Sequence, residues 1–434
     1  MASSSLSLAF LFSLLFTVSF SEAKTSSRPF LKVTKDAKTL QYVTQISQRT
    51  PLVQVKLSLD LGGEFIWVNC EKGYASSTFT NPICDSSPCQ LLNTTSCITA
   101  CFSPPSVDCA NNTCGSFPTN PFGSISTSGP IVGDVFAIQS TDGKNVLPMI
   151  KVPSFYFVCG SNNIDIGLAN GVTGVAGLGR TKMSLPAQLS SYFEYDTKFA
   201  LCLSSSTKSS GAVFFGDGPY TLLPNVDASS SLSYTPLIIN SIITGGGFVG
   251  DASPEYFIGV KSIKVNDKRV NFNESLLSFD AEGRGGTIIS TNKPYTVLET
   301  TIYKALVSAF VKAMPKNVER VPNVAPFGAC YSTKNIGSTR VGPAVPSIDL
   351  VLESKNVWRI FGANSMVAVK NDVLCLAFVE ARTDFAPTIP VVIGGHQIED
   401  NLLQFDLEKS RLGFSSTLLG RSTSCANFNF TSAV

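Results

Sequence analysis

The most regular alternation of apolar and polar residues in the chain lies at residues 53–60, which read VQVKLSLD. A period of two predicts a β-strand with one buried face. The strand ends on Asp60, and the two glycines soon after it predict a turn, so this carboxylate is presented at the end of a sheet. A second apolar run, at residues 65–68, begins directly after the turn.

The second half of the chain shows a related pattern. Two short apolar runs on either side of residues 266–267 predict a hairpin, because Asn-Asp is a turn sequence. Residues 302–314 carry an apolar stripe with helical spacing and stop at Pro315, which predicts an amphipathic helix. Hydrophobic segments that end in glycine occur once in each half, at 174–179 and 391–395. This weak duplication predicts two similar units.

Residues 217–250 are rich in Ser, Pro, Asn and Gly and have little periodicity, so they mark the boundary between the halves. We expect a signal segment at 1–23, an N-terminal lobe with a Cys-rich insert at 24–220 and a C-terminal lobe at 221–434. The predicted fold is all-β, with two pseudo-symmetric lobes and short helices flanking a central cleft. Residues 129–138 are expected to form two strands joined by a turn.

Composition and charge exclude several classes of protein. The net charge is +2 without a basic cluster, which argues against a nucleic-acid partner. The first twenty residues carry no charged side chain and precede Ser21-Glu22-Ala23, which indicates a secretory signal cut near Ala23. A transmembrane anchor is the alternative for this segment. No other stretch reaches the ~20 apolar residues that a membrane span requires.

Twelve cysteines in a secreted chain predict a disulfide framework of six bridges. Seven of them fall in a stretch that is also rich in Ser and Asn, which indicates a stapled loop region. A zinc site is the alternative, but the single histidine and the lack of any Cys-x-x-Cys pair argue against it, and we expect no metal or cofactor. The cysteines are Cys70, Cys84, Cys89, Cys97, Cys101, Cys109, Cys114, Cys159, Cys202, Cys330, Cys375 and Cys425.

Four Asn-x-Ser/Thr sequences are acceptors for N-linked glycans in a secretory chain. They begin at Asn93, Asn111, Asn273 and Asn429. We expect that at least one of them is used, so the protein is predicted to be a secreted glycoprotein.

The stretch around Asp60 resembles the first catalytic loop of the pepsin-like aspartic proteases, which reads Asp-Thr-Gly-Ser and continues to an aromatic residue, Trp-Val and, in plants, Cys. Asp60, Gly62 and the run Trp67-Val68-Asn69-Cys70 match this pattern, whereas Leu61 and Gly63 depart from it. The resemblance implies a bilobal pepsin-like fold. It also implies a second loop of the form Gly-Gly-x-x-x-Asp-Ser/Thr-Gly-Thr.

Residues 285–303 match the frame of that second loop, but Ser290 occupies the position of the catalytic Asp and Asn292 that of a Gly. Aspartic proteolysis needs two carboxylates that share one proton, and a serine hydroxyl cannot take part in such sharing. Asp60 and Ser290 are therefore interpreted as remnants of a catalytic pair, and no peptidase activity is expected. A serine nucleophile with His396 is the alternative, which would need a third group to position the imidazole.

Taken together, the Asp60 loop, Ser290, the Cys-rich insert and the Ile-Gly-Gly-His-Gln sequence at 393–397 resemble the plant extracellular dermal glycoprotein group. That group includes the xyloglucan-specific endoglucanase inhibitors. The resemblance implies a cell-wall protein that binds microbial endoglucanases of glycoside hydrolase family 12, and it suggests a bridge between Cys330 and Cys375. We expect a monomer.

In the inhibitor group, loops of the C-terminal lobe enter the cleft of the target enzyme, whose catalytic carboxylates suit an arginine. Arg320, in a Pro-bounded loop, and Arg382 are the candidates here. Arg382 lies further from the 391–395 segment than the arginine of the group, and Thr388 occupies the nearer position. The alternatives to an inhibitor are a non-enzymatic binding or storage glycoprotein of the basic globulin type and a divergent peptidase.

Overall fold

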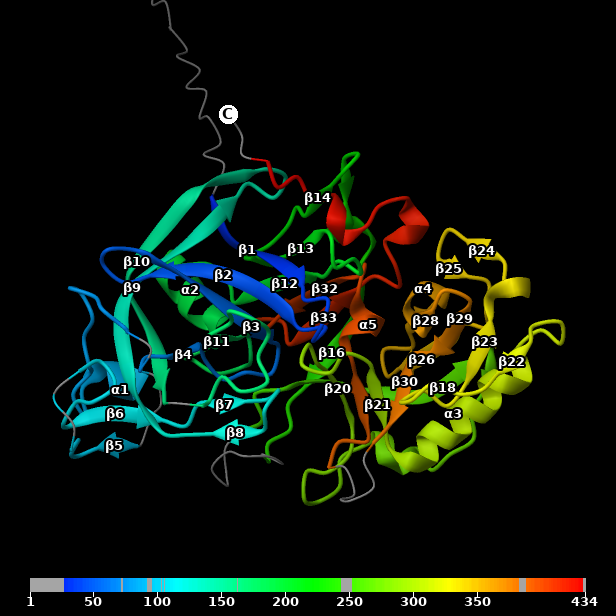
Figure 1. Ribbon diagram of the computed structural model, residues 1–434, viewed down its shortest axis with the longest axis horizontal. Coiled ribbons are helices and arrows are strands. Elements are labelled where there is room, and N and C mark those ends of the chain that lie inside the picture. Colours follow the sequence, from blue (N-terminus) through cyan, green and yellow to red (C-terminus); the bar gives the residue numbers. More distant parts are fainter. Residues whose placement is uncertain are drawn as a thin grey trace, which may run out of the picture.

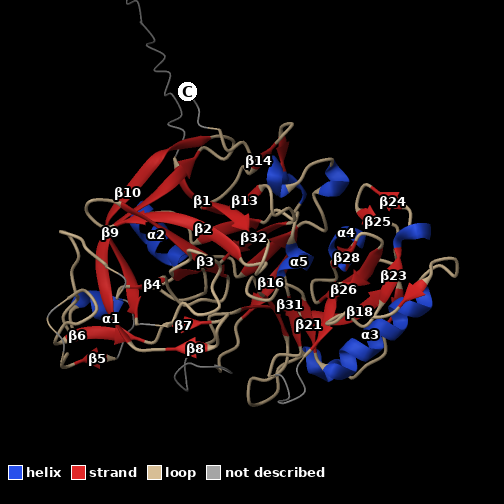
Figure 2. Ribbon diagram, in the orientation of Figure 1, coloured by secondary structure: helices blue, strands red, loops and turns tan. Residues whose placement is uncertain are grey.

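The computed structural model describes residues 27–71, 73–91, 96–102, 104, 106–161, 163–242, 252–381 and 388–431. These residues form a mostly β structure with few and mostly short helices, as Figures 1 and 2 show. The predicted all-β fold is therefore confirmed. The predicted signal segment at 1–23 lies outside the described residues. No helix within the described ranges is long and apolar enough to cross a membrane.

The N-terminal half is built on curved antiparallel strands around an apolar core. The alternation at residues 53–60 forms a strand with those bounds, in which Leu57 and Leu59 are fully buried. The elements of this half are β1 (Arg28–Lys35), β2 (Tyr42–Gln48), β3 (Val53–Asp60), β4 (Trp67–Asn69), α1 (Ser87–Leu91), β5 (Cys97–Ile98), β6 (Thr113–Ser116), β7 (Thr119–Asn120), β8 (Ile125–Ser126), β9 (Gly129–Thr141), β10 (Val146–Gly160), β11 (Gly174–Gly177), α2 (Leu185–Phe193), β12 (Lys198–Cys202) and β13 (Ser210–Phe215).

The C-terminal half adds shorter strands, two four-stranded sheets (β19-β18-β26-β27 and β22-β23-β29-β28) and the longest helix. Its elements are β14 (Thr221–Leu222), β15 (Val226–Asp227), β16 (Ser233–Ile238), β17 (Tyr256–Ile258), β18 (Val260–Val265), β19 (Lys268–Arg269), β20 (Thr287–Ile289), β21 (Thr296–Leu298), α3 (Thr300–Ala313), β22 (Arg320–Val321), β23 (Cys330–Ser332), β24 (Ser338–Thr339), β25 (Gly342–Pro343), β26 (Ile348–Leu352), β27 (Val357–Ile360), α4 (Gly362–Ser365), β28 (Met366–Lys370), β29 (Val373–Leu376), β30 (Phe378–Glu380), β31 (Val391–Ile393), α5 (Gly395–Ile398), β32 (Leu402–Asp406) and β33 (Arg411–Phe414).

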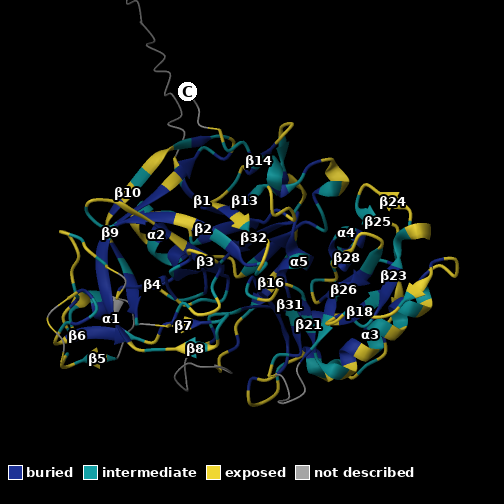
Figure 3. Ribbon diagram, viewed as in Figure 1, coloured by how far each residue is buried: buried dark blue, intermediate teal, exposed yellow. Residues whose placement is uncertain are grey.

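Helix α3 confirms the amphipathic helix predicted at residues 302–314, two residues early at its start. It begins where the Glu299 carboxylate accepts hydrogen bonds from the Thr301 and Ile302 amides, which caps the free N–H groups of the first turn. Its stripe of Ile302, Leu306 and Phe310 is buried, and its other side is open to solvent (Figure 3). Burial of one face fixes the helix on β18 and β30.

The expected hairpin at 266–267 is also present, since β18 and β19 pair around it and both turn residues have positive φ, which Asn and Asp tolerate. The turn expected within residues 129–138 is wrong. That stretch belongs to the single strand β9, in which Gly133 leaves room for the Tyr156 ring of β10 and for Thr80. Asp134 accepts hydrogen bonds from Tyr74 and Thr78, so Gly-Asp here serves strand packing and not a turn.

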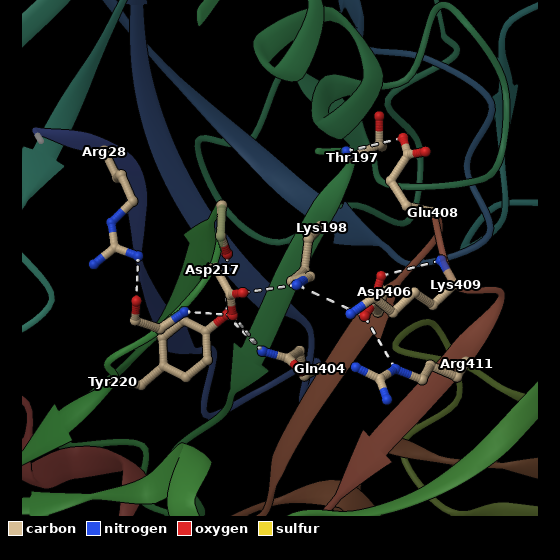
Figure 4. A network of polar contacts seen from close by, with 12 residues as sticks. Arg28, Thr197, Lys198, Asp217, Tyr220, Gln404, Asp406, Glu408, Lys409 and Arg411 are labelled. Atoms are coloured by element: carbon tan, nitrogen blue, oxygen red, sulfur yellow. Dashed lines mark hydrogen bonds and ion pairs between the residues drawn. The ribbon is translucent and has the colours of Figure 1, made fainter. Parts of the chain in front are cut away.

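A shared sheet joins the two halves. Strand β12 of the first half pairs antiparallel with β32 of the second, which places Lys198 opposite Asp406. Figure 4 shows Lys198 between two carboxylates, 2.7 Å from Asp217 and 3.6 Å from Asp406 Oδ2, while Arg411 lies 3.0 Å from the same Asp406 oxygen. Because Asp406 is fully buried, these cations stabilise a charge that would otherwise be costly at the junction.

Six disulfides join all twelve cysteines, as the count predicted. Three of them staple the insert of the first half, and Cys70–Cys159 ties the start of the insert to β10. Cys202–Cys425 ties the C-terminal segment to β12. The Cys330–Cys375 bridge that the resemblance implied joins β23 to β29. The other bridges are Cys84–Cys97, Cys89–Cys114 and Cys101–Cys109.

Candidate functional site

Asp60 lies at the end of β3, where the segment β11 runs parallel to it and places Gly177 beside it. The Leu178 amide donates to the Asp60 carbonyl at 2.9 Å, and this fixes the backbone of the loop. A side chain at Gly177 would meet the Phe65 and Gly63 carbonyl oxygens, so only glycine permits the close approach.

Ser290 occupies the equivalent place in the second half. It follows β20, which runs parallel to β31, and its amide donates to the Ile393 carbonyl at 2.9 Å. The two hydrophobic segments that end in glycine, predicted from sequence as a repeated feature, therefore flank the two loops in the same manner. Both loop residues are buried, with Asp60 8% and Ser290 3% exposed.

The two loops are joined by one threonine. The Thr291 hydroxyl accepts a hydrogen bond from the Leu61 amide at 2.9 Å and donates to the Leu59 carbonyl at 3.0 Å. The side chain of Leu61 cannot make matching hydrogen bonds to the backbone of the second loop, because this buried side chain has no polar atom. The link between the loops is thus made from one side.

Asn292 connects the two residues interpreted as catalytic remnants. Its Nδ2 donates to Asp60 Oδ1 at 3.4 Å, and its Oδ1 accepts from the Ser290 hydroxyl at 2.7 Å. The Gly62 amide also donates to Asp60 Oδ1 at 3.1 Å. Among the described residues, no hydrogen bond joins Asp60 directly to Ser290, so the serine hydroxyl points to the amide and leaves the carboxylate to other donors.

Burial raises the pKa of Asp60 to about 6, although the Gly62 amide, Asn292 and the charge of Lys293 favour the ionised form. A pKa of about 6 is close to the values of carboxylates that act as general bases in enzymes. Asp60 lacks, on the second loop, the protonated carboxyl that aspartic proteolysis requires as its partner.

A second carboxyl group does lie at the site, and it comes from the residue that directly precedes strand β17. The Glu255 carboxylate lies against Gly62: a Cβ on that glycine would be 2.3 Å from Glu255 Oε2. Burial, followed by the charge of Asp60, raises the pKa of Glu255 to about 8. Glu255 therefore remains protonated at neutral pH while Asp60 ionises, and the two groups titrate as neighbours.

Sequence reasoning missed Glu255 because its position depends on strand register. Strand β17 pairs with β20 so that Tyr256 lies opposite Ile289, which brings the preceding residue, Glu255, alongside Ser290. The available signal was a lone acidic residue directly before a buried apolar run, Tyr256-Phe-Ile. That signal predicts where strand β17 begins, but it does not predict that β17 pairs with β20.

His396 has a structural environment. Its Nε2 lies 2.9 Å from the Met366 carbonyl and its Nδ1 lies 3.4 Å from Glu399. Glu399 also accepts from the Tyr42 hydroxyl at 2.7 Å and pairs with Lys35. Because the hydroxyl of Ser290 is bonded to Asn292 instead, these contacts give no support to a serine nucleophile.

Two family models match most of the chain. The model described as xylanase inhibitor N-terminal matches residues 42–217, and the model described as xylanase inhibitor C-terminal matches residues 255–416. The chain belongs to the xylanase inhibitor family. The resemblance stated from the two loops is thereby confirmed.

Relatives in this family align over almost the whole length. The chain is 56% identical to a Nicotiana benthamiana protein named "Probable aspartic proteinase GIP2", over 97% of each chain. A solved structure described as that of edgp has 52% identity and a TM-score of 0.90, covering 94% of this chain and 100% of the other. Conglutin gamma from lupine seeds, described as a basic 7S globulin, has 38% identity and a TM-score of 0.81, with 93% and 99% covered.

Arg320, a candidate contact residue that was expected in a Pro-bounded loop of the C-terminal half, is exposed on the short strand β22. Its Nη2 donates to the Gly328 carbonyl at 3.1 Å, and β22 pairs with β23 next to the Cys330–Cys375 bridge. No carboxylate of the described residues forms an ion pair with Arg320. Arg382 lies outside the described residues, and Thr388 is exposed, with its carbonyl accepting from the Gly285 amide.

Three of the four predicted glycan acceptors are described. Asn111 and Asn273 are exposed and Asn429 is partly exposed, whereas Asn93 lies outside the described residues. The ranges that the structure describes contain no group of three or more His, Cys, Asp or Glu side chains arranged to hold a metal ion.

Proposed function

We propose that this protein is a secreted inhibitor of microbial endoglucanases that degrade the plant cell wall, in particular xyloglucan-specific enzymes of glycoside hydrolase family 12. It acts by inserting loops of its C-terminal half into the active cleft of the target. The observation that carries the proposal is Arg320, which is exposed, tethered and without a carboxylate partner among the described residues.

The chemistry of the target cleft supports this choice of residue. Glycosidases of this kind carry two catalytic carboxylates. A guanidinium presents five N–H donors in a fixed plane and pairs with a carboxylate through two of them. The bond from Arg320 to the Gly328 carbonyl and the nearby Cys330–Cys375 bridge limit the freedom of the hairpin, so less entropy is lost on binding.

The same proposal includes the absence of peptidase function. Ser290 cannot share a proton with Asp60, and it is bonded to Asn292. Glu255 is a neighbouring acid but directly precedes strand β17 and is not part of the paired loops. We expect no cleavage of a denatured protein substrate at acid pH. Cleavage that a transition-state-mimicking peptide inhibitor blocks would instead establish a divergent peptidase.

The test is an inhibition panel of the purified protein against family 12 xyloglucanases and against xylanases, with release of reducing sugar as the readout. We expect one class to be inhibited through a stoichiometric complex. Arg320→Ala is expected to weaken that complex by about 30-fold or more, since central arginines contribute about 2 kcal/mol or more at such interfaces.

Arg340→Ala is the matched control, because Arg340 is also an exposed arginine in a short turn of the same half. Its inhibition constant is expected to equal that of the parent protein. If Arg320→Ala and Arg340→Ala inhibit equally well, Arg320 is not the contact residue. If no enzyme of the panel is inhibited by the parent protein, the proposed function is wrong.

The likeness to a basic 7S globulin of lupine seeds favours one second candidate, a non-enzymatic binding or storage glycoprotein. A pull-down from plant apoplastic fluid without any microbial enzyme separates the two functions. An inhibitor is expected to be recovered alone, whereas a binding protein is expected to bring down an endogenous peptide or wall polymer.

A further inference from the structure

Strands β1, β2 and β9 lie together in the N-terminal half, and each pairs with the other two along one edge (Figure 1). On this edge, β1 pairs with β9 at Arg28 and Pro29 and with β2 at residues 33–35, while β2 pairs with β9 at Ser47 and Gln48. Along this edge, each strand therefore has a short stretch of backbone that pairs with neither of the other two strands. These stretches are residues 30–32, 45–46 and 138–139, and a groove of about 620 Å³ lies over them.

Most side chains that line the groove and meet solvent are polar, and Met149 is a large apolar exception. Successive residues of a strand point to opposite faces, so one face of the sheet collects alternate residues from each strand. The buried floor includes Ile46, Ala137 and Ile138. The exposed polar lining consists of amides, hydroxyls and two cations: Lys32, Thr34, Gln45, Gln54, Lys56, Gln139, Asn170 and Thr207. The exposed side chains of Met149 and Ala37 lie beside them.

The two lysines lie in one row across the sheet. Gln45 pairs with Lys56 in the register of β2 and β3, and Val33 pairs with Thr44 in the register of β1 and β2. Lys32 and Gln45 are the first residues beyond the paired stretch of β1 and β2, at the point where the two strands part. Lys32 on β1 and Lys56 on β3 therefore lie on either side of β2, which carries Gln45 between them.

The positive charge of this row is not neutralised within the described part of the chain. Lys35, at the edge of the groove, pairs with the buried Glu399 at 2.5 Å. Asp36 accepts hydrogen bonds from the Thr39 amide and hydroxyl of its own turn, at 2.7 Å each. Lys32 lies over the Phe430 ring at 5.1 Å, and neither Lys32 nor Lys56 has a carboxylate partner among the described residues.

We propose that this groove binds a short chain of uronic acids. Amides offer both a donor and an acceptor, which matches the hydroxyl groups of a sugar, and the lysine ammonium groups match its carboxylates. The site lies on the outer face of the first half, away from Arg320, and does not depend on the proposed inhibition.

An acidic peptide fits less well. Peptides that bind sheets add a strand to a free edge or place alternate side chains in pockets. Here the unpaired stretches are only two or three residues long, so an added strand would find few backbone partners, and most of the exposed lining is amide and hydroxyl. The lining therefore favours a polyhydroxylated ligand over a peptide.

The test uses the full mature protein and trigalacturonate as the probe, titrated by calorimetry near pH 5 at low salt. Cellotriose serves as the neutral probe of equal length and triglutamate as the acidic peptide. We expect saturable binding of trigalacturonate alone. Lys32→Gln/Lys56→Gln is expected to weaken it at least tenfold, with unchanged thermal stability and unchanged endoglucanase inhibition.

Lys261→Gln/Lys370→Gln is the matched control, because both residues are exposed lysines on strands of the other half. Three results overturn the proposal. They are no saturable binding of trigalacturonate by the parent protein, equal loss of binding in the two double variants, and binding of triglutamate as tight as that of trigalacturonate. The last result would assign the groove to acidic peptides.

Discussion

Replacing Glu255 by Gln tests the electrostatics of the cleft directly. Asp60 and Glu255 have folded-state pKa values of about 6 and about 8, both above the ordinary values of 3.8 and 4.5. The folded protein therefore keeps protons that the unfolded chain has released. The stability that this gives is complete below about pH 4 and is lost as the pH rises through the folded-state values.

The size of this loss follows from the two shifts. Between pH 5 and pH 7.5 the linkage relation gives about 3 kcal/mol for Glu255 and about 1 kcal/mol for Asp60. Because Glu255 is partly exposed, solvent screens its charge, and the measured loss is expected at or below that figure. Glutamine has the same shape and does not titrate. The stability of Glu255→Gln relative to the parent protein should therefore rise by up to about 3 kcal/mol over this range.

The assay is urea unfolding at pH 5 and pH 7.5, at one ionic strength and with the disulfides intact. Glu319→Gln is the control, since Glu319 is exposed, and its free energy of unfolding should follow that of the parent protein at both pH values. A difference between Glu255→Gln and the parent that is the same at both pH values would refute the inference that this carboxyl group is held in a poorly solvated place beside Asp60.

Two further predictions concern contacts that fix the fold around the cleft. Thr291→Val removes the hydroxyl that joins the loops and leaves the Leu61 amide and Leu59 carbonyl unpaired. The free energy of unfolding is expected to fall by about 2–4 kcal/mol in urea titrations, and an unchanged value would contradict the role of this link. Burial alone raises the pKa of Glu399, but His396 and Lys35 outweigh it and hold the pKa below the ordinary 4.5. Stability from Glu399 is thus present above about pH 4.5 and lost on acidification, so Glu399→Gln should lose less stability than the parent protein between about pH 5 and pH 3. Equal acid sensitivity of the two proteins in thermal melts would count against this account.

The parts of the fold that local pattern determines could be predicted from the sequence. The strand at 53–60 was predicted with its observed bounds, because the alternation of residue types marks a strand. Its single buried face was not predicted correctly, since residues 57–60 are buried on both faces. The turn expected within 129–138 was wrong. Gly133 packs against Tyr156 and Asp134 accepts a hydrogen bond from Thr78, and the local sequence does not reveal these contacts with distant residues.

The candidate site shows the same division. Asp60 and Ser290 could be located from the loops that carry them, and the structure brings those loops together. Glu255 could not be located, since it reaches the site through the register of β17 with β20. The bridging role of Asn292 could not be predicted either. An Asn in place of the expected Gly shows that the loop departs from the pattern, but it does not show that the Asn292 amide contacts both Ser290 and Asp60.

The pairing of β12 with β32 has a consequence for any attempt to divide the molecule. A fragment that ended near residue 217 would expose the edge of β12 as an open template for association, with Lys198 deprived of Asp406. The complementary fragment would keep Asp406 but lose Lys198, and the Cys202–Cys425 bridge could not form in either. Neither piece is a self-sufficient domain, so proteolytic cuts are expected to be tolerated only while both segments remain associated.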